Sequence, residues 1–550
     1  MIYLLDYGAG NVRSVRNAIN SFGFEVREAR RPEDILAADK LIFPGVGNFG
    51  VVMGRLVAAG FAEALRQRIA LGKPTFGICV ALQAMFEGSE EAPGVAGLGI
   101  IPGQVRRFFQ SGLSVPQIGW NNLKLWRDSP YFAGYGGELV YFVHSFYAAL
   151  AENNRDWTLA TTNYGGEYIS AVAKGEVIAT QFHPEKSGQA GLNILGNFLK
   201  RRETATIAGV AACPRPIDSQ VAAGQVAGSS PGLAKRIIAC LDVRANDQGD
   251  LVVTKGDQYD VREEGVVRNL GQPVALAERY YHEGADEIAF LNITGFRDFP
   301  LQDQPMLEVL EKTSEKVFVP LTIGGGIRAF TDKNGKHYSA LDVAGRYFRA
   351  GADKISIGSD AVTTVEAYLR RPPAHLSANQ AGTVAANPIT EISRVYGAQA
   401  VVISVDPRRV YVKDPGATGH ACIKTKFPGP GGERYCWYQC TVSGGREGRD
   451  IDVVQLATVC ERLGAGEILL NCIDRDGGNQ GFDLELIAQV KAAVSIPVIA
   501  SSGAGKSGHF PEVFSRTGAD AALAAGIFHR REVAINDIKA ACAEAGFAVR

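Results

Sequence analysis

The segment RIIACLDV, residues 236–243, is an almost wholly apolar run with an aspartate next to its end. Parallel strands that are covered by helices on both faces have this composition. Similar runs follow, separated by helical patterns, at 287–293, 317–324, 354–359, 400–407, 467–474, 496–502 and 521–527. Eight such strand–helix units predict a (β/α)8 TIM barrel over residues 234–550.

The barrel region also repeats itself. Four pairs of short segments match in the same order: CLDV at 240 with SVDP at 404, GADEI at 284 with GAGEI at 464, IGGGI at 323 with SGAGK at 502, and GADKI at 351 with GADAA at 518. Matches in one register predict a two-fold repeat of four strand–helix units.

Asp242 ends the first predicted strand and Asp406 ends the fifth, on opposite sides of the barrel mouth. Active sites of such barrels lie at the carboxyl ends of the strands. Either aspartate alone could be a cap or an ion-pair partner. Their placement by the repeat favours a pair of carboxyl groups that work as acid and base.

Glycine-rich turns follow strands 3 and 7, as GGGIR (324–328) and SGAGK (502–506). Small residues also end strands 4 and 8, as GSDA (358–361) and AAGIF (524–528). Turns of this kind expose backbone N–H groups to anions, although a single one is often only a loop. Their repetition predicts two phosphate sites and a substrate with two phosphates.

Charged residues open strands 1, 2, 4 and 6: Arg236, Glu287, Lys354 and Glu467. Two positive and two negative side chains at the barrel bottom can form a salt-bridged ring. Residues at this end of the fold usually serve stability.

Residues 1–202 alternate helical patterns with short apolar runs at Ile2–Leu5, Lys40–Phe43, Thr75–Ile78, Leu139–Phe142 and Val177–Gln181. This pattern predicts a separate α/β domain. Residues 203–233 are rich in small residues with Gly, Pro and Ser and have no amphipathic period, which predicts a linker.

Cys79 follows a predicted strand and precedes a helical pattern, a position that exposes the sulfur and favours its thiolate. His183 and Glu185 are two residues apart in an extended segment, so their side chains can share a side. Together they form a candidate nucleophile, base and orienting carboxylate. A lone cysteine is more often a buried apolar residue. The turn PGVGNFG (44–50) could offer N–H groups to an oxyanion.

The N-terminal region resembles the class I glutamine amidotransferases in five motifs that occur in the order of that family: PGVG, GIC, PQIGWN (116–121), YFVHSF (141–146) and QFHPEKS (181–187). The resemblance implies a flavodoxin-like fold and hydrolysis of glutamine through a thioester on Cys79, with His183 as base and Glu185 as orienter. It also implies that Gly45, Gln83 and Glu91 contact the substrate. The family elbow ends in glycine where this chain has Ala81, and a methyl group there is expected to slow the reaction without abolishing it.

The barrel region resembles the phosphate-carrying barrels of histidine biosynthesis in the segments KRIIACLDV, VTKGDQY, TIGGGIR, GADKISIGSDA, VVISVDP, GAGEILLNCIDRDG and LAAGIFH. The resemblance is closest to the cyclases of the imidazole glycerol phosphate synthase family, in its bifunctional eukaryotic form. The resemblance implies that ammonia attacks a phosphoribulosyl-formimino-aminoimidazole carboxamide ribotide. The products would be imidazole glycerol phosphate and aminoimidazole carboxamide ribotide.

The same resemblance implies roles for individual residues. Asp242 and Asp406 would be the acid–base pair, and Lys255 would contact the substrate. One phosphate would be held by Gly325, Gly326, Gly358 and Ser359, and the other by Asp476, Gly477, Ser502, Gly503, Ala525 and Gly526. Arg236, Glu287, Lys354 and Glu467 would gate the entry of ammonia, which must cross a dry path because ammonium is not a nucleophile.

Two alternatives remain open at this point. The barrel could isomerise a related ribosyl precursor, but a fused glutaminase argues against a reaction that needs no ammonia. The N-terminal half could be degenerate, but an intact Cys79, His183 and Glu185 argue against that.

The long segment after the fifth predicted strand contains four residues of the types that bind zinc: His420, Cys422, Cys436 and Cys440. Their spacing is not that of a standard zinc site, so no metal or cofactor is predicted. The segments at 370–390 and 411–450 are predicted to be long loops. The second would be a lid over the substrate or a structural hairpin, in which YCWYQCTV (435–442) is interpreted as a strand.

The composition bounds the partners. The formal net charge is -1, without the basic surplus of a nucleic-acid binder. Nine cysteines in 550 residues are too sparse for a disulfide scaffold. The segment MIYLLDYGAGNVRSV has no signal-peptide character, and no run is apolar enough to span a membrane. We therefore expect a cytoplasmic protein that binds small molecules, which the resemblances imply are glutamine and a bisphosphorylated ribotide. Because the glutaminase is fused to the barrel and no separate subunit is needed, we expect a monomer.

Overall fold

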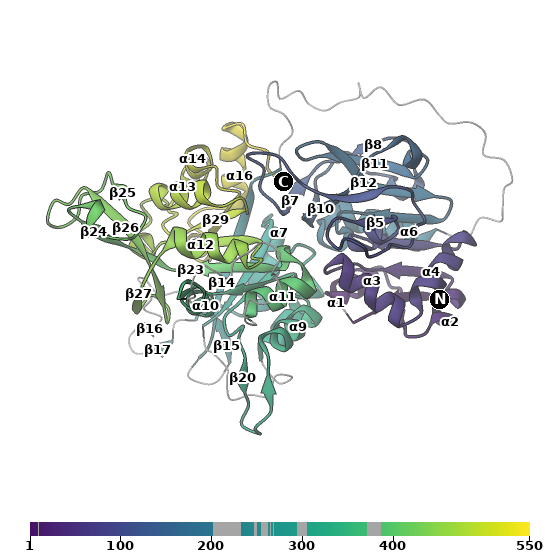
Figure 1. Ribbon diagram of the computed structural model, residues 1–550, viewed down its shortest axis with the longest axis horizontal. Helices are drawn as coiled ribbons and strands as arrows, with labels where there is room; N and C mark the ends of the chain where they lie inside the picture. Colours follow the sequence, from purple (N-terminus) through teal and green to yellow (C-terminus); the bar gives the residue numbers. More distant parts are fainter. Residues whose placement is uncertain are drawn as a thin grey trace. The chain divides into compact units, whose positions relative to one another are not determined.

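The computed structural model describes residues 1–8, 10–201, 233–246, 250–254, 262–263, 266–267, 269–293, 305–370 and 387–550. These residues form two compact units, Met1–Ala234 with Arg550, and Lys235–Val549 (Figure 1). The predicted linker lies outside the described residues except for residue 233.

The N-terminal unit is built on a mixed sheet. Its parallel part runs β2-β1-β3-β4-β13, with β1 (Ile2–Leu5), β2 (Val26–Ala29), β3 (Lys40–Phe43), β4 (Thr75–Ile78) and β13 (Val177–Thr180). Antiparallel pairing continues it through β12 (Glu167–Lys174) and β10 (Phe146–Ala148) to β6 (Gln104–Arg107), and β5 (Gly88–Ser89) then pairs with β6 in parallel. Two more strands, β11 (Thr158–Asn163) and β8 (Lys124–Leu125), branch from β12. This order agrees with the predicted α/β domain.

Helices connect the strands of this sheet: α1 (Val12–Asn20), α2 (Pro32–Ala37), α3 (Phe49–Ala58), α4 (Phe61–Ala70), α5 (Val80–Ala84) and α6 (Gly188–Lys200). All four residues of β4 are buried, as expected for a strand covered on both faces. The strand predicted at Leu139–Phe142 is β9 (Val140–His144). It pairs with β7 (Gln117–Asn121) outside the main sheet.

The C-terminal unit is a closed barrel, as predicted. Its parallel strands are β14 (Arg236–Ala245), β18 (Glu287–Asn292), β19 (Leu321–Gly324), β22 (Lys354–Ile357), β23 (Val401–Val405), β28 (Glu467–Asn471), β29 (Val498–Ser501) and β30 (Ala521–Ala524). β30 pairs back onto β14 and closes the ring. Inward side chains such as Ile238, Val402 and Leu469 form the apolar core.

Two strands begin later than predicted. β19 starts at Leu321 and β29 at Val498, each directly after a proline. Pro320 and Pro497 have no N–H group to give to a neighbouring strand, which accounts for both shortened starts.

Helices surround the barrel: α7 (Pro273–His282), α8 (Pro305–Ser314), α9 (Ala340–Ala350), α10 (Ser359–Leu369), α11 (Pro388–Tyr396), α12 (Val453–Arg462), α13 (Leu484–Ala493), α14 (His509–Thr517), α15 (Gly526–His529) and α16 (Ile535–Glu544). Short strands lie in the connections: β15 (Leu251–Val253), β16 (Arg262–Glu263), β17 (Val266–Val267), β20 (Phe330–Thr331) and β21 (His337–Tyr338). Within the described ranges, no helix is long and apolar enough to cross a bilayer.

The segment at 411–450 is a small antiparallel sheet, which agrees with the hairpin alternative, although more of the segment is in strands than the predicted long loop implied. Its strands are β24 (Pro407–Val412), β25 (Ile423–Lys424), β26 (Tyr435–Val442) and β27 (Glu447–Asp452). The interpretation of YCWYQCTV as a strand is confirmed by β26. Arg409 of β24 lies 2.7 Å from Asp483 at the start of α13, which ties the sheet to the barrel. The segment at 370–390 lies mostly outside the described residues.

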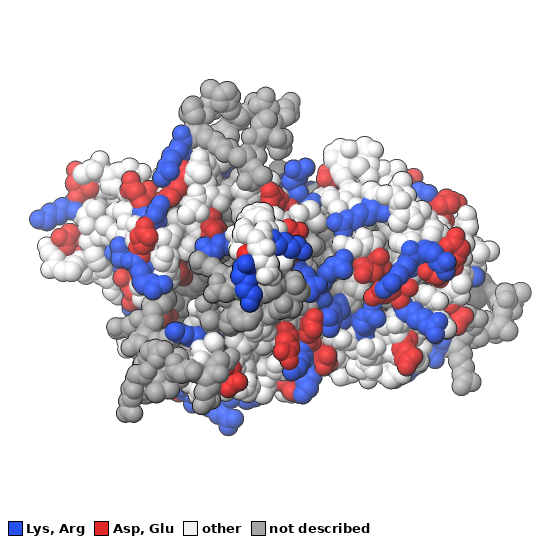
Figure 2. All heavy atoms as spheres, turned by 90° about the horizontal axis from the view of Figure 1, so that it is seen from below, with Lys and Arg blue, Asp and Glu red and all other residues white. Residues whose placement is uncertain are grey.

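Charged side chains of both signs are interspersed over the face seen in Figure 2. This mixture agrees with the net charge of -1. Among the described residues on this face, charges of one sign form no continuous field of the kind that attracts nucleic acid.

Candidate active sites

Cys79 lies on the sharp turn between β4 and α5, as predicted. Its backbone has φ 55° and ψ -112°, a left-handed conformation that residues other than glycine rarely adopt. Strain of this kind persists where surrounding contacts hold it, and here the Cys79 N–H donates to the Thr180 carbonyl at 2.6 Å. The turn aims the thiol away from the strand in the manner of a nucleophile elbow.

His183 follows β13, which pairs in parallel with β4, and this pairing brings it to Cys79. Its Nδ1 lies 2.8 Å from Glu185 Oε1, and both side chains are buried. Burial alone would lower the pKa of His183, but the charges of Glu185 and Cys79 and hydrogen bonds to both raise it well above its ordinary value. The imidazole can therefore take the thiol proton and hold it.

The glycine-rich turn after β3 packs against this elbow. A Cβ on Gly45 would lie 2.3 Å from the Ala81 nitrogen and 2.5 Å from the Ile78 carbonyl oxygen, so only glycine fits. The predicted oxyanion turn thus lies against Ile78 and Val80, the residues on either side of Cys79.

Ala81 has room in this elbow. It lies within α5, and even a Cβ built on Gly77 would be 3.4 Å from its methyl group, an ordinary van der Waals distance. The structure shows no crowding on that side. A slowed glutaminase stays a prediction.

Gln83 and Glu91 already have partners in the protein. Both N–H groups of Gln83 are engaged, with the Phe146 carbonyl at 2.8 Å and Gln181 Oε1 at 3.0 Å, so only its oxygen can still accept a bond from a ligand. Glu91 accepts a hydrogen bond from the Phe49 N–H at the start of α3. Burial raises the pKa of Glu91 to about 7, against the opposing effect of its hydrogen bonds.

The two barrel aspartates stand four strands apart in the closed sheet, Asp242 in β14 and Asp406 directly after β23. Asp406 Oδ1 accepts a hydrogen bond from Asn471 Nδ2 at 3.1 Å, while Asp242 Oδ1 lies 3.8 Å from Cys240 Sγ. The closed strand order therefore puts the two carboxyl groups on opposite sides of the mouth, as predicted.

The first predicted phosphate cluster follows the adjacent strands β19 and β22. Gly325 and Gly326 have φ 92° and 76°, and a Cβ on Gly325 would come within 2.1 Å of the Asn292 carbonyl oxygen. Gly358 and Ser359 form the start of α10, whose first N–H groups can bind an anion.

The second cluster follows the adjacent strands β29 and β30, half the barrel away. Ser502 Oγ donates to Asp476 Oδ1 at 3.2 Å, and Gly477, Ser502 and Gly503 all have positive φ. Ala525 and Gly526 stand at the start of α15. Lys255, the remaining predicted substrate contact, lies outside the described residues.

The four charged strand starts form a closed ring at the barrel bottom. Arg236 bonds Glu287 at 2.8 Å and also Glu467, and Lys354 Nζ lies 2.7 Å from Glu287 and 2.6 Å from Glu467. All four side chains are essentially inaccessible to solvent. Burial alone would raise the pKa of Glu287, but Lys354 and Arg236 hold it below its ordinary value.

Three residues at these sites were not predicted. Tyr7 is buried near the backbone of Val46 and the thiol of Cys79, Gln181 donates to Cys79 Sγ, and Asn471 donates to Asp406. The repeat offered a signal for Asn471, because LLN at 469–471 matches FLN at 290–292. No sequence pattern distinguishes Tyr7.

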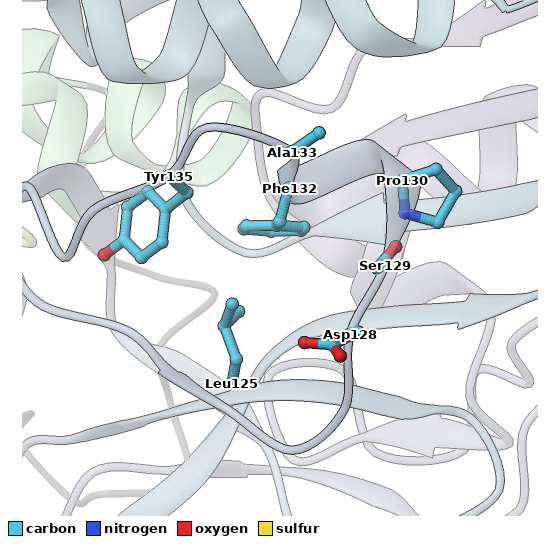
Figure 3. Close-up of a pocket in the computed structure, with 7 residues that line it drawn as sticks. All are labelled: Leu125, Asp128, Ser129, Pro130, Phe132, Ala133 and Tyr135. Carbon is cyan, nitrogen blue, oxygen red and sulfur yellow. The ribbon is translucent and has the colours of Figure 1, made fainter. Parts of the chain in front are cut away.

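The N-terminal unit also has a hollow of about 410 Å³, shown in Figure 3. It is lined by Leu125, Asp128, Ser129, Pro130, Phe132, Ala133 and Tyr135, and none of these is a predicted site residue.

Among the residues that the structure describes, no three His, Cys, Asp or Glu side chains gather as metal ligands. Trp437 stacks on His420 with ring centroids 3.7 Å apart.

Comparison with known proteins gives matches to both halves. The family "Glutamine amidotransferase class-I" matches residues 3–201, and "Histidine biosynthesis protein" matches residues 236–371 and again 362–534. The double match agrees with the predicted two-fold repeat.

Full-length relatives are also found. The chain is 55% identical to the chloroplastic imidazole glycerol phosphate synthase hisHF of Arabidopsis thaliana, over 98% of this chain and 88% of that protein. It is 53% identical to imidazole glycerol phosphate synthase hisHF of Emericella nidulans, over 100% and 98%, and 53% identical to that of Schizosaccharomyces pombe, over 98% and 98%. These relatives are named synthases, which argues against the isomerase alternative.

We expect Gly45→Ala to lower glutamate release from glutamine about a hundredfold or more, because the new methyl group would displace the turn from the elbow. Gly54→Ala in α3 is the matched control, since a Cβ there meets no atom within 4 Å. Glutaminase assays on both variants check this, and equal activity would show that the turn plays no part in the reaction.

We expect Glu467→Gln to lower the free energy of unfolding of the barrel by about 3–5 kcal/mol, because it leaves Arg236 and Lys354 with one carboxylate between them. Glu308→Gln is the control, because its ion pair with Lys312 is exposed and should cost under about 1 kcal/mol. Urea unfolding followed by fluorescence measures both.

The same ring predicts a pH dependence. Since the pKa of Glu287 is lowered in the folded state, its stabilisation is present above the unfolded value of about 4.3 and is lost as the pH falls through the folded value. Equal loss of stability in acid for Glu287→Gln and the parent would contradict this.

Proposed function

The chain belongs to the bifunctional imidazole glycerol phosphate synthase family, and from that premise we propose how its own residues divide the work. It is an enzyme of histidine biosynthesis with a glutamine amidotransferase half and a cyclase half. Glutamine is hydrolysed in the first half, and the ammonia is consumed in the second.

In the N-terminal half, Cys79 attacks the carboxamide of glutamine after His183 takes its proton. His183 then gives that proton to the departing ammonia, and Glu185 keeps the imidazole oriented throughout. Water hydrolyses the thioester on Cys79 and releases glutamate. The main support is the hydrogen bond of 2.8 Å between His183 and Glu185 beside a strained Cys79. The backbone at Gly45 would bind the oxyanion.

In the barrel, the two turn clusters hold the two phosphates of the ribotide, so its middle lies between Asp242 and Asp406. The hydrogen bond from Asn471 Nδ2 to Asp406 Oδ1 fixes the orientation of this carboxyl group, which suits a group that exchanges a proton with the substrate. Ammonia adds to the substrate, and proton transfers by the two carboxyl groups accompany cleavage into imidazole glycerol phosphate and aminoimidazole carboxamide ribotide.

Ammonia must reach the mouth without being protonated by bulk water. We propose that it passes through the barrel core and that the ring of Arg236, Glu287, Lys354 and Glu467 is its gate. A closed ring of buried ion pairs blocks the passage of water, and exchange of one ion-pair partner would open it. The substrate contact of Lys255, the domain boundaries at 202 and 234, the monomeric state and the cytoplasmic location stay predictions.

We expect Cys79→Ala to abolish the use of glutamine and to keep cyclisation with ammonium salts, because ammonia then comes from solution. Asp242→Asn should abolish cyclisation with either nitrogen source, because a carboxamide cannot transfer the proton. Production of imidazole glycerol phosphate with glutamine or with ammonium chloride measures both effects.

Glutamate release, with and without the ribotide, is the accompanying control. A large increase on adding the ribotide supports communication between the halves. Full glutamine-dependent turnover by Cys79→Ala would remove the nucleophile assignment, and silence of the parent towards glutamine would mean that the N-terminal half is inert.

The raised pKa of Glu91 leads us to expect that glutamine binding depends on pH. Its pKa of about 7 means that it loses its negative charge as the pH falls below 7, and with it the attraction for the ammonium group of glutamine. The KM for glutamine should therefore rise about tenfold per pH unit below 7. Glu91→Gln should show a high KM that no longer depends on pH in this range, whereas Glu63→Gln, at an exposed position of α4, should behave like the parent.

A further inference from the structure

A chain of buried hydrogen bonds leads to the sulfur of Cys79. The Phe146 carbonyl accepts from Gln83 Nε2 at 2.8 Å, Gln83 Nε2 also donates to Gln181 Oε1 at 3.0 Å, and Gln181 Nε2 lies 3.6 Å from Cys79 Sγ. The three partners come from different elements: β10, α5 and the residue after β13.

The chain allows only one orientation of each amide. A carbonyl oxygen cannot donate, so the group of Gln83 that faces Phe146 must be its NH2. The second N–H of that group then requires the oxygen of Gln181. The NH2 of Gln181 is consequently turned towards Cys79, and an amide in the opposite orientation would place an oxygen against the sulfur.

Both side chains are deeply buried, with Gln181 0% and Gln83 2% exposed. Water therefore cannot replace a lost partner at low cost, and each unmade bond in this chain would be expensive. Amide groups in such a place are kept in one state by their neighbours.

We propose that Gln181 is a further catalytic residue of the glutaminase half, donating an N–H hydrogen bond that stabilises the thiolate of Cys79, and that Gln83 is a positioning residue that fixes the orientation of that donor. The proposal rests on the nucleophile role assigned to Cys79 above. Hydrogen bonds to an ionised acceptor are about twice as strong as neutral ones, so this bond strengthens when the thiol loses its proton.

Other titratable groups also act on Cys79. His183 follows β13, Tyr7 follows β1 and Tyr168 lies in β12, and each interacts with the charge of the sulfur. His183 is the one that exchanges a proton with the thiol. Gln181 cannot titrate, so its contribution is a constant bias towards the thiolate at every pH.

The test measures the thiolate without requiring turnover. The full chain is treated with iodoacetamide over a range of pH in the absence of glutamine, and alkylation of Cys79 is followed by peptide mass spectrometry. Gln181→Met removes the donor at nearly constant volume. We expect the midpoint of the profile to move up by about one pH unit and alkylation at pH 7 to slow about tenfold.

A double-variant cycle tests the part played by Gln83. Gln83→Met should move the midpoint in the same direction by less, because the Gln181 amide then samples both orientations. The double variant should match Gln181→Met alone, since without the donor there is nothing left for Gln83 to orient. Gln189→Met, at a more exposed amide in α6, is the control and should match the parent.

A midpoint for Gln181→Met that equals that of the parent would overturn the proposal, and additive shifts in the double variant would overturn the role of Gln83. If Gln181→Met does not fold, Gln181→Glu keeps the length and faces the sulfur with a carboxylate, so a larger upward shift is expected and an unchanged midpoint again refutes the idea. Cys79→Ala separates the two levels. Full glutamine turnover by that variant would refute the nucleophile itself, whereas its silence together with an unshifted Gln181→Met would refute the donor only.

Discussion

Thr180 pairs with Ile78 because β13 and β4 run in parallel, and the chemistry of the N-terminal half depends on this pairing. Parallel strands bring their carboxyl ends to one edge of a sheet, so the residues that follow them meet there although they are far apart in sequence. Cys79 follows one strand and His183 the other. The same constraint acts in the barrel, where closure of β30 onto β14 gathers every strand end around one mouth.

Burial sets the chemical character of both halves. Glu185 and Cys79 raise the pKa of His183 despite its burial, so the imidazole can hold the proton that it takes from the thiol. The ring at the barrel bottom keeps four ionic groups away from water by pairing each with two opposite charges. Buried charges are tolerated only when they are fully paired. Such groups can move or hold protons without competition from solvent.

Several features were predictable because they depend on local pattern. Apolar runs ending in Asp242 and Asp406 indicated strands of a barrel, and the turn at Cys79 was predicted from its place between strand and helix. The sheet at 411–450 was predicted only in part. The apolar strand β26 was recognisable, but its partners β24, β25 and β27 are short or polar and are defined by pairing with β26 and not with the barrel. The late start of β19 is due to Pro320, which cannot donate a hydrogen bond to a neighbouring strand. An apolar run alone does not reveal this effect.

The sequence by itself determined the two folds, the order of the motifs and the identity of the candidate nucleophile, base and aspartates, since hydrophobic period, turn residues and motif spacing are local properties of the chain. Only the tertiary structure decided that Gln181, 98 residues from Gln83, turns its amide towards Cys79, and that Asn471, 65 residues from Asp406, donates to that carboxylate. The physical reason is that the orientation of an amide depends on which acceptors and donors surround it. Those neighbours are assembled only when the strands pair.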